Sequence, residues 1–143
     1  MNSKAIVTLS DSNYFQLLLE LIESIKNKDK KKEVSICVLD AGLTEEQSKI
    51  IRDKVYSIKK AKWDIEVPSI KVGKKEWLKS QVSRAFLPDY FPEFEKYLWI
   101  DCDAWVNSWE TIELYFEACK NGKLGITQTI GPGYRILTKV RWV

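Results

Sequence analysis

The sequence contains no histidine among its 143 residues. This absence excludes histidine-based general-base catalysis, catalytic triads built on histidine and histidine-ligated zinc within the chain. Metal binding or proton transfer must therefore rely on carboxylates, and carboxylate ligands favour Mg²⁺, Mn²⁺ or Ca²⁺.

Cysteine pairs and strong net charge are also missing. The three cysteines, Cys37, Cys102 and Cys119, form no Cys-x-x-Cys motif, and their odd number predicts free thiols in a reducing cytoplasm. A formal net charge of only +3 is too weak to indicate a nucleic-acid partner. The densest basic run, residues 26–32, predicts a solvated loop with at most peripheral contact with an anionic membrane.

Long apolar runs are absent as well. None approaches the roughly 18 residues that a membrane span requires. The N-terminus enters an apolar, strand-like segment without a small-residue cleavage site, so a secretory leader is not expected. The length and the 45% hydrophobic content predict one domain, residues 1–143, with a real core.

Short apolar runs alternate with helical patterns along the chain. This order is typical of an α/β, Rossmann-like fold, in which a mostly parallel sheet carries helices on both faces. Ligands of such sheets bind beyond the carboxyl ends of the strands. The runs predict strands at 5–9, 34–39, 63–67, 97–100 and 124–129, and the spacing predicts helices over 15–26, 44–58, 76–86 and 109–120.

Two aspartates, Asp101 and Asp103, follow directly after the apolar run 97–100. Two carboxylates one residue apart can converge on a divalent cation, which commonly completes its shell with substrate phosphates and water. Such a cation neutralises charge on a departing diphosphate. An alternative remains open, in which the Asp101 side chain caps a turn and Asp103 is merely solvated.

A polar cluster follows the first predicted strand. Tyr14 could stack on a planar base, while Asp11 and Asn13 could form hydrogen bonds with the edge of that base. The alternative is ordinary loop chemistry, with Ser12 or Asn13 as a helix N-cap.

Arg84 lies near the end of the predicted helix 76–86. Its guanidinium matches the geometry of phosphate oxygens, although a surface ion pair is an equal alternative. Lys79 and Ser80 on the same helix are weaker candidates. Trp99 and Trp105 bracket the aspartate pair, and one or both are interpreted as core residues rather than sugar platforms.

Four stretches carry a resemblance to a known family, in the order and spacing of that family. They are IVTLSDSNY, VLDAGLTEEQ, the segment from SRAFLPDY to YLWIDCDAWV, and LGITQT. Together they resemble glycosyltransferase family 8, the retaining galactosyl- and glucosyltransferases that include glycogenin and bacterial lipopolysaccharide enzymes. The resemblance implies a nucleotide-diphospho-sugar transferase (GT-A) fold and hexose transfer from a UDP-sugar to a glycan or lipid-linked acceptor.

The resemblance also implies roles for individual residues. The nucleotide would be held by Asp11, Asn13, Tyr14 and the backbone of Leu9. Arg84 would contact the phosphates or the sugar. Asp101 would contact ribose and metal, Cys102 would lie between the aspartates in the donor site, and Asp103 would be the main metal ligand. The metal implied is Mn²⁺, with Mg²⁺ as the other candidate. No catalytic residue is assigned.

This sequence departs from the family pattern in two ways. The family supplies a third metal ligand, a histidine, from far downstream, and this chain has none. The second departure lies beyond the strand that follows the aspartate pair. There the family has a segment with an Asn-x-Gly core and a polar residue near the anomeric carbon of the sugar, and this sequence has no such segment. We therefore expect a donor-binding half whose C-terminal part is incomplete.

Two further hypotheses compete with hexosyl transfer. The chain could be a module that binds a nucleotide sugar without transferring it. A phosphatase of the haloacid dehalogenase type also places Asp-x-Asp after an apolar strand. In that class the motif opens the chain and Thr or Val follows the second aspartate by two residues, where this chain has Trp105.

Overall fold

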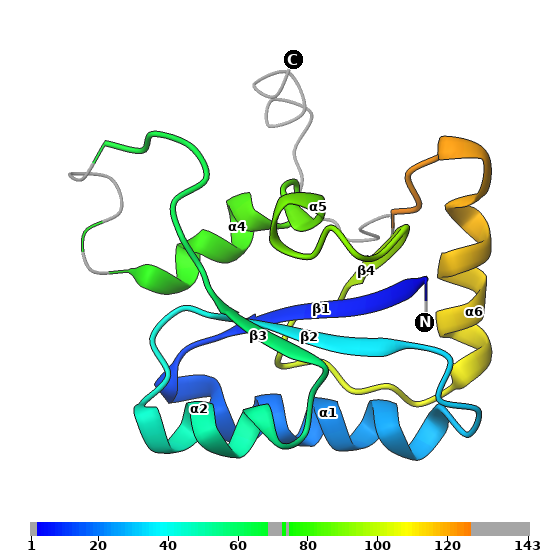
Figure 1. The fold of residues 1–143 in the computed structure, drawn as a ribbon, viewed down its shortest axis with the longest axis horizontal. Helices are drawn as coiled ribbons and strands as arrows, with labels where there is room; N and C mark the ends of the chain where they lie inside the picture. Colours follow the sequence, from blue (N-terminus) through cyan, green and yellow to red (C-terminus); the bar gives the residue numbers. More distant parts are fainter. Residues whose placement is uncertain (1–2, 69–72, 74, 127–143) are drawn as a thin grey trace, which may run out of the picture.

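The computed structural model describes residues 3–68, 73 and 75–126. Within these residues the centre is a four-stranded sheet in the order β3-β2-β1-β4, and all three pairings are parallel (Figure 1). The strands are β1 (Lys4–Ser10), β2 (Ser35–Asp40), β3 (Ser57–Lys60) and β4 (Lys96–Trp99). The prediction of a parallel α/β sheet is therefore confirmed.

Helices cover both faces of this sheet. In Figure 1, α1 and α2 lie on one side of the strands, and α4 and α5 lie on the other. The bounds of the α-helices are α1 Phe15–Lys28, α2 Glu45–Arg52, α4 Lys79–Ser83, α5 Leu87–Tyr90 and α6 Trp109–Ala118. Short 3₁₀ turns occupy η1 Ser12–Tyr14, η2 Glu76–Leu78 and η3 Lys120–Gly122. Among the described residues, no helix has the length and apolarity needed to cross a membrane.

Alternation along β1 divides the core into two parts. Ile6 packs with the apolar faces of α1, α2 and α6, whereas Val7 and Leu9 pack with α5 and the segment after it. Because successive side chains of a strand point to opposite faces, one buried strand serves both layers. Both layers hold β1 and β2 rigidly, and the carboxyl ends of these strands are fixed with them.

The third strand was predicted at the wrong place. Residues 63–67 form no strand, and β3 lies instead at Ser57–Lys60, overlapping the end of the segment 44–58 that was assigned to a helix. β3 is an edge strand paired only with β2, and its residues are half-buried or exposed. Pairing of the backbone with β2, rather than an apolar run, defines β3. The apolar residues within segment 63–67 therefore misplaced the predicted strand.

The helix boundaries also differ from the prediction. α2 ends at Arg52, six residues before the predicted end, and begins with a capping box formed by Thr44 and Gln47. The helix predicted over 76–86 is divided into η2 and α4 and ends at Ser83.

The end of the described chain differs in a similar way. α6 ends at Ala118, two residues before the predicted end, and Asn121 and Gly122 beyond it have positive φ. Residues 124–126 of the fifth predicted strand are not in a strand, and the remainder of it lies outside the described residues.

Candidate functional site

A cavity of about 260 Å³ lies at the carboxyl ends of β1 and β4. It is the place where a parallel sheet of this kind binds its ligands. Five of its lining residues were predicted from the resemblance or from the motifs: Leu9, Asp11, Tyr14, Asp101 and Asp103. Cys102 also lines it as expected, and Ser10, Trp77, Ser80 and Gln81 complete the wall.

The turn after β1 is organised by the carboxylate of Asp11. Its Oδ1 accepts hydrogen bonds from the backbone N–H groups of Asn13 at 2.9 Å and Tyr14 at 3.3 Å. Asp11, not Ser12 or Asn13, is therefore the N-cap of η1, which corrects the alternative considered from the sequence. The turn leaves Tyr14 at the cavity with 45% of its surface exposed.

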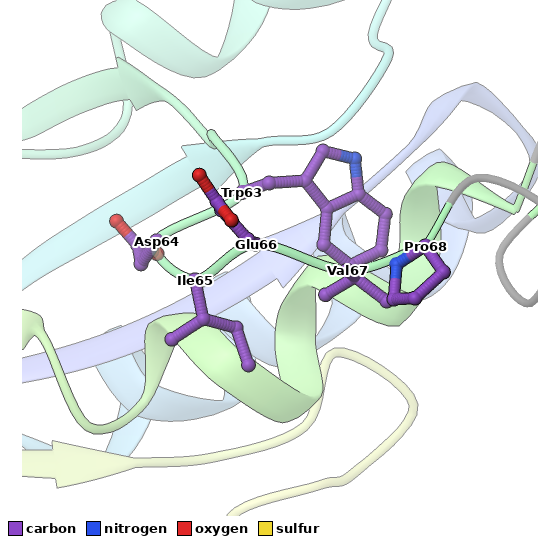
Figure 2. Close-up of a pocket in the computed structure, with 6 residues that line it drawn as sticks. All are labelled: Trp63, Asp64, Ile65, Glu66, Val67 and Pro68. Atoms are coloured by element: carbon purple, nitrogen blue, oxygen red, sulfur yellow. The ribbon is translucent and has the colours of Figure 1, made fainter.

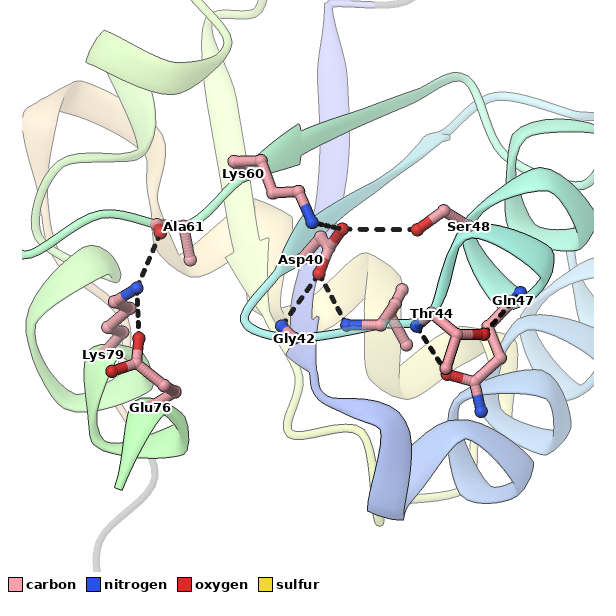
Figure 3. Close-up of polar contacts among 10 residues, drawn as sticks. Asp40, Gly42, Thr44, Gln47, Ser48, Lys60, Ala61, Glu76 and Lys79 are labelled. Atoms are coloured by element: carbon pink, nitrogen blue, oxygen red, sulfur yellow. Dashed lines mark hydrogen bonds and ion pairs between the residues drawn. The ribbon is translucent and has the colours of Figure 1, made fainter. Parts of the chain in front are cut away.

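The neighbouring strand end holds this turn in place through Asp40, which is 3% exposed. Its Oδ1 accepts from the N–H groups of Gly42 and Leu43, both at 2.8 Å, and its Oδ2 lies 2.6 Å from Nζ of Lys60. Figure 3 shows Asp40 between Gly42 and Lys60. The Gly42 carbonyl in turn accepts from the Ser12 N–H at 3.2 Å. The buried carboxylate thus positions the loop that carries Asp11 and Tyr14.

The ionised form of Asp40 is favoured by these contacts. Burial alone would raise the pKa of this carboxyl group. The hydrogen bond from Lys60 and those from the backbone of Leu43 and Gly42 outweigh burial and hold the pKa below its ordinary value.

Asp101 begins the turn that follows β4. The turn is closed by its backbone carbonyl, which accepts from the Ala104 N–H at 3.0 Å. Its side chain does not cap the turn, contrary to the alternative considered from the sequence. Instead Oδ1 accepts from Nε1 of Trp99 at 2.7 Å and from Nη2 of Arg84 at 3.4 Å.

The remaining residues of the motif differ in their surroundings. Asp103 is exposed, and its side chain makes no hydrogen bond or ion pair within the described part of the chain. Cys102 is half-buried. Burial raises the pKa of its thiol and outweighs a hydrogen bond with Ser10, while the Asp103 and Asp101 carboxylates raise it further. Without a bound cation, these surroundings favour the neutral thiol.

A buried bond anchors the segment after the motif to α1. The Oγ of Ser24 accepts from the Val106 N–H at 3.0 Å and donates to the Leu21 carbonyl at 2.7 Å. Val106 itself is buried in the core. The Asp-x-Asp turn is therefore fixed on both sides, by β4 before it and by this anchor after it.

The donor set at this turn fits a hard divalent cation. Asp101 and Asp103 supply carboxylate oxygens, and Mg²⁺-type ions use one or two carboxylates together with phosphate and water ligands. Among the described residues no cluster of three acidic, cysteine or histidine side chains could enclose a metal by itself. A cation held here would therefore need oxygens from a bound ligand.

One wall of the cavity was not predicted from the sequence. Ser80 was only a weaker candidate, and Trp77 and Gln81 were not proposed for the site, yet all three line the cavity. Their segment is tied to the end of β3, because Nζ of Lys79 donates to the Ala61 carbonyl at 3.0 Å and pairs with Glu76 (Figure 3). No local sequence signal reveals this long-range contact.

Two predicted residues lie beside the cavity rather than on its wall. The Arg84 side chain is 38% exposed and forms an ion pair with Asp101 at 3.4 Å, which matches the ion-pair alternative; its guanidinium also packs over Trp99, 5.1 Å from the ring centre. Asn13 is exposed on η1. Trp99 is half-buried and packs against the buried apolar cluster, as expected for one of the two tryptophans, whereas Trp105 is 60% exposed.

A larger hollow, about 730 Å³, lies along Trp63–Pro68 (Figure 2). Its lining comes from one continuous segment, whereas the smaller cavity draws residues from the ends of β1 and β4 and from η2 and α4. A binding site requires polar groups that converge from several elements. The smaller cavity is therefore the candidate site.

The fold is that of the GT-A class of glycosyltransferases. Two solved structures share it. An active-site mutant of LgtC has a TM-score of 0.56 and 22% sequence identity, over 78% of this chain and 41% of that chain. Galactosyltransferase LgtC in complex with donor and acceptor sugar analogs has a TM-score of 0.55 and 23% sequence identity, over 76% of this chain and 41% of that chain. No curated protein matches the sequence. The chain spans about two fifths of the length of LgtC.

The family itself follows from the sequence match. The model of glycosyl transferase family 8 matches residues 5–122, which include both strand ends that form the cavity. The chain belongs to glycosyltransferase family 8.

Proposed function

We propose that this chain is the donor-binding part of a hexosyltransferase that uses a UDP-sugar and a divalent cation. The observation that carries the proposal is one cavity that joins the Asp11–Tyr14 turn of β1 to the Asp101–Asp103 turn of β4. A nucleotide diphosphate sugar needs these two functions together, a place for a flat base and a carboxylate pair for the cation on its diphosphate.

The cation would be held by Asp101 and Asp103, with Asp103 as the main ligand. Its exposed carboxylate has no competing partner within the described residues, whereas Oδ1 of Asp101 is already engaged. We infer Mn²⁺, with Mg²⁺ as the alternative, because oxygen donors suit both ions. When bound, the cation would neutralise charge that develops on the departing diphosphate.

Arg84, at the C-terminal end of α4, would help to stabilise the negative charge that develops on the departing diphosphate. Its Nε is fixed by the Ser80 carbonyl at 2.9 Å, and its guanidinium lies over Trp99. Nη2 reaches Asp101 at the cavity, and the guanidinium fork matches the geometry of phosphate oxygens. Transfer with retention and the use of a glycan or lipid-linked acceptor complete the proposal; no nucleophile is assigned.

The base would lie against Tyr14, with Asp11, Asn13 and the Leu9 backbone near its edge. Trp77 is 47% exposed and lines the same cavity, so it provides a second aromatic surface for the ligand. Stacking on an aromatic side chain does not select one particular base, because every base presents a flat face.

Replacing Tyr14 with alanine should weaken UDP binding about 5- to 150-fold, since stacking of a base on an aromatic side chain is worth roughly 1–3 kcal/mol. Calorimetric titration with UDP and Mn²⁺ measures the change. Tyr56→Ala is the matched control, because Tyr56 is comparably exposed and lies outside the cavity. Equal affinities for both variants and the unaltered chain would remove Tyr14 from the site.

A second candidate function is binding without transfer. One observation favours it: among the described residues, no third acidic, cysteine or histidine side chain joins Asp101 and Asp103 as a metal ligand. Calorimetry with UDP and Mn²⁺ tests donor binding, and a turnover assay with UDP-galactose and UDP-glucose tests transfer. Binding with turnover supports the enzyme, binding alone supports the module, and no binding contradicts both.

A further inference from the structure

The carboxylate of Asp101 is oriented by two donors before any ligand arrives. Nε1 of Trp99 lies 2.7 Å from Oδ1, and Nη2 of Arg84 lies 3.4 Å from the same atom. No partner of Oδ2 occurs among the residues that the structure describes. The two oxygens of this carboxylate are therefore unequal.

Trp99 is well placed to fix this asymmetry. It is the last residue of β4, in register with Val7 of β1, and its ring packs against the buried cluster beneath α5. An indole N–H can only donate, so it requires an acceptor, and here that acceptor is the carboxylate of Asp101. A rigid ring with a fixed donor holds one carboxylate oxygen at a defined position.

We propose that Trp99 is a positioning residue that engages Oδ1 of Asp101 and leaves Oδ2 to take the divalent cation. Arg84 supports the same arrangement, because its guanidinium stacks on the Trp99 ring and reaches the same Oδ1. Trp99 acts through Asp101 and touches neither cation nor donor. This inference rests on the proposed metal role of the Asp101–Asp103 pair.

The substitution Trp99→Phe removes the N–H while keeping an aromatic ring. It should weaken Mn²⁺ binding in the presence of UDP by about 10-fold or more, as is typical when a partner of a metal ligand is lost. Trp105→Phe is the matched control, because Trp105 stands two residues after Asp103, is 60% exposed and does not line the cavity. Calorimetric titration of Mn²⁺ into each variant with saturating UDP gives the affinities, and equal affinities for the two variants would overturn the inference.

A double-mutant cycle with Asp101→Asn separates positioning from general damage. If Trp99 acts through Asp101, Trp99→Phe causes little further loss of Mn²⁺ affinity in the Asp101→Asn chain. A loss of the same size in both backgrounds would mean a merely structural effect and would overturn the inference. If Asp101→Asn alone keeps full Mn²⁺ affinity, the proposed metal role of Asp101 fails instead.

A second measurement does not depend on whether Trp99→Phe folds. The chain has six tryptophans, whose indole N–H groups give side-chain signals in a ¹H–¹⁵N NMR spectrum. Asp101→Asn should shift the signal of Trp99 and leave that of Trp105, identified by its loss in Trp105→Phe, in place. A spectrum in which Asp101→Asn shifts no indole signal would exclude the bond on which the inference depends.

Discussion

Replacing Asp103 with alanine should abolish Mn²⁺-dependent UDP binding while leaving the fold intact. Its carboxylate is exposed at the cavity and makes no hydrogen bond or ion pair within the described residues, so its loss removes no structural contact. A direct ligand should cost more than roughly 100-fold in metal affinity, because even outer partners of metal ligands cost about 10–100-fold. Calorimetry with UDP, with and without Mn²⁺, measures both quantities.

Asp53→Ala is the control for the loss of one negative charge. Asp53 is exposed at the C-terminal end of α2 and does not line the cavity. Its side chain has no partner among the described residues. This variant should bind UDP and Mn²⁺ as the unaltered chain does. If Asp103→Ala also keeps its affinity and its metal dependence, the carboxylate pair is not the cation site. Matching thermal melts of the two variants would exclude unfolding as the cause of any loss.

The sequence was sufficient to predict the strands that are buried on both faces. The apolar runs that became β1 and β2 have neighbours on two sides, so their side chains report their position directly. β3 was missed because an edge strand needs only one pairing partner, and its residues Ser57–Lys60 include one apolar side chain. Hydrophobic pattern therefore predicts the centre of such a sheet better than its edge.

The residues of the candidate site also divide into those that the sequence could predict and those that it could not. Residues at strand ends, such as Asp11 and Asp101, could be predicted because parallel strands bring their carboxyl ends to one edge. Trp77 and Gln81 could not, because their place depends on the contact between Lys79 and the carbonyl of Ala61 across the molecule. The bond from Trp99 to Asp101 depends on side-chain rotamers, which no spacing rule contains.

Asp40→Ala should destabilise the fold by about 3–4 kcal/mol, the largest stability effect we expect from one polar substitution in this chain. Two backbone N–H groups, of Gly42 and Leu43, lose a charged acceptor, and hydrogen bonds to charged groups contribute roughly 1.5–3 kcal/mol each. The pair with Lys60 adds little, since the Lys60 side chain is 76% exposed. Chemical denaturation monitored by tryptophan fluorescence gives the free energy of unfolding.

Two further variants separate the contributions of Asp40. Asp40→Asn keeps an acceptor oxygen without the charge and should lose about half as much stability, roughly 1–2 kcal/mol. Lys60→Ala removes only the exposed partner and should cost less than about 1 kcal/mol. If Lys60→Ala were as damaging as Asp40→Ala, the ion pair rather than the loop would be the source of stability.

The pH dependence provides an independent test of Asp40. Its pKa is lowered in the folded chain, so its contribution to stability is fully present above the unfolded pKa, near 3.9, and is lost as pH falls through the lower folded pKa. The difference in unfolding free energy between the unaltered chain and Asp40→Asn should therefore be constant near neutral pH and shrink below about pH 4.

Asp40→Ala should also weaken UDP binding, because the Gly42 carbonyl accepts the hydrogen bond from the Ser12 N–H. A variant that lost stability but bound UDP normally would show that the loop keeps its shape without this carboxylate.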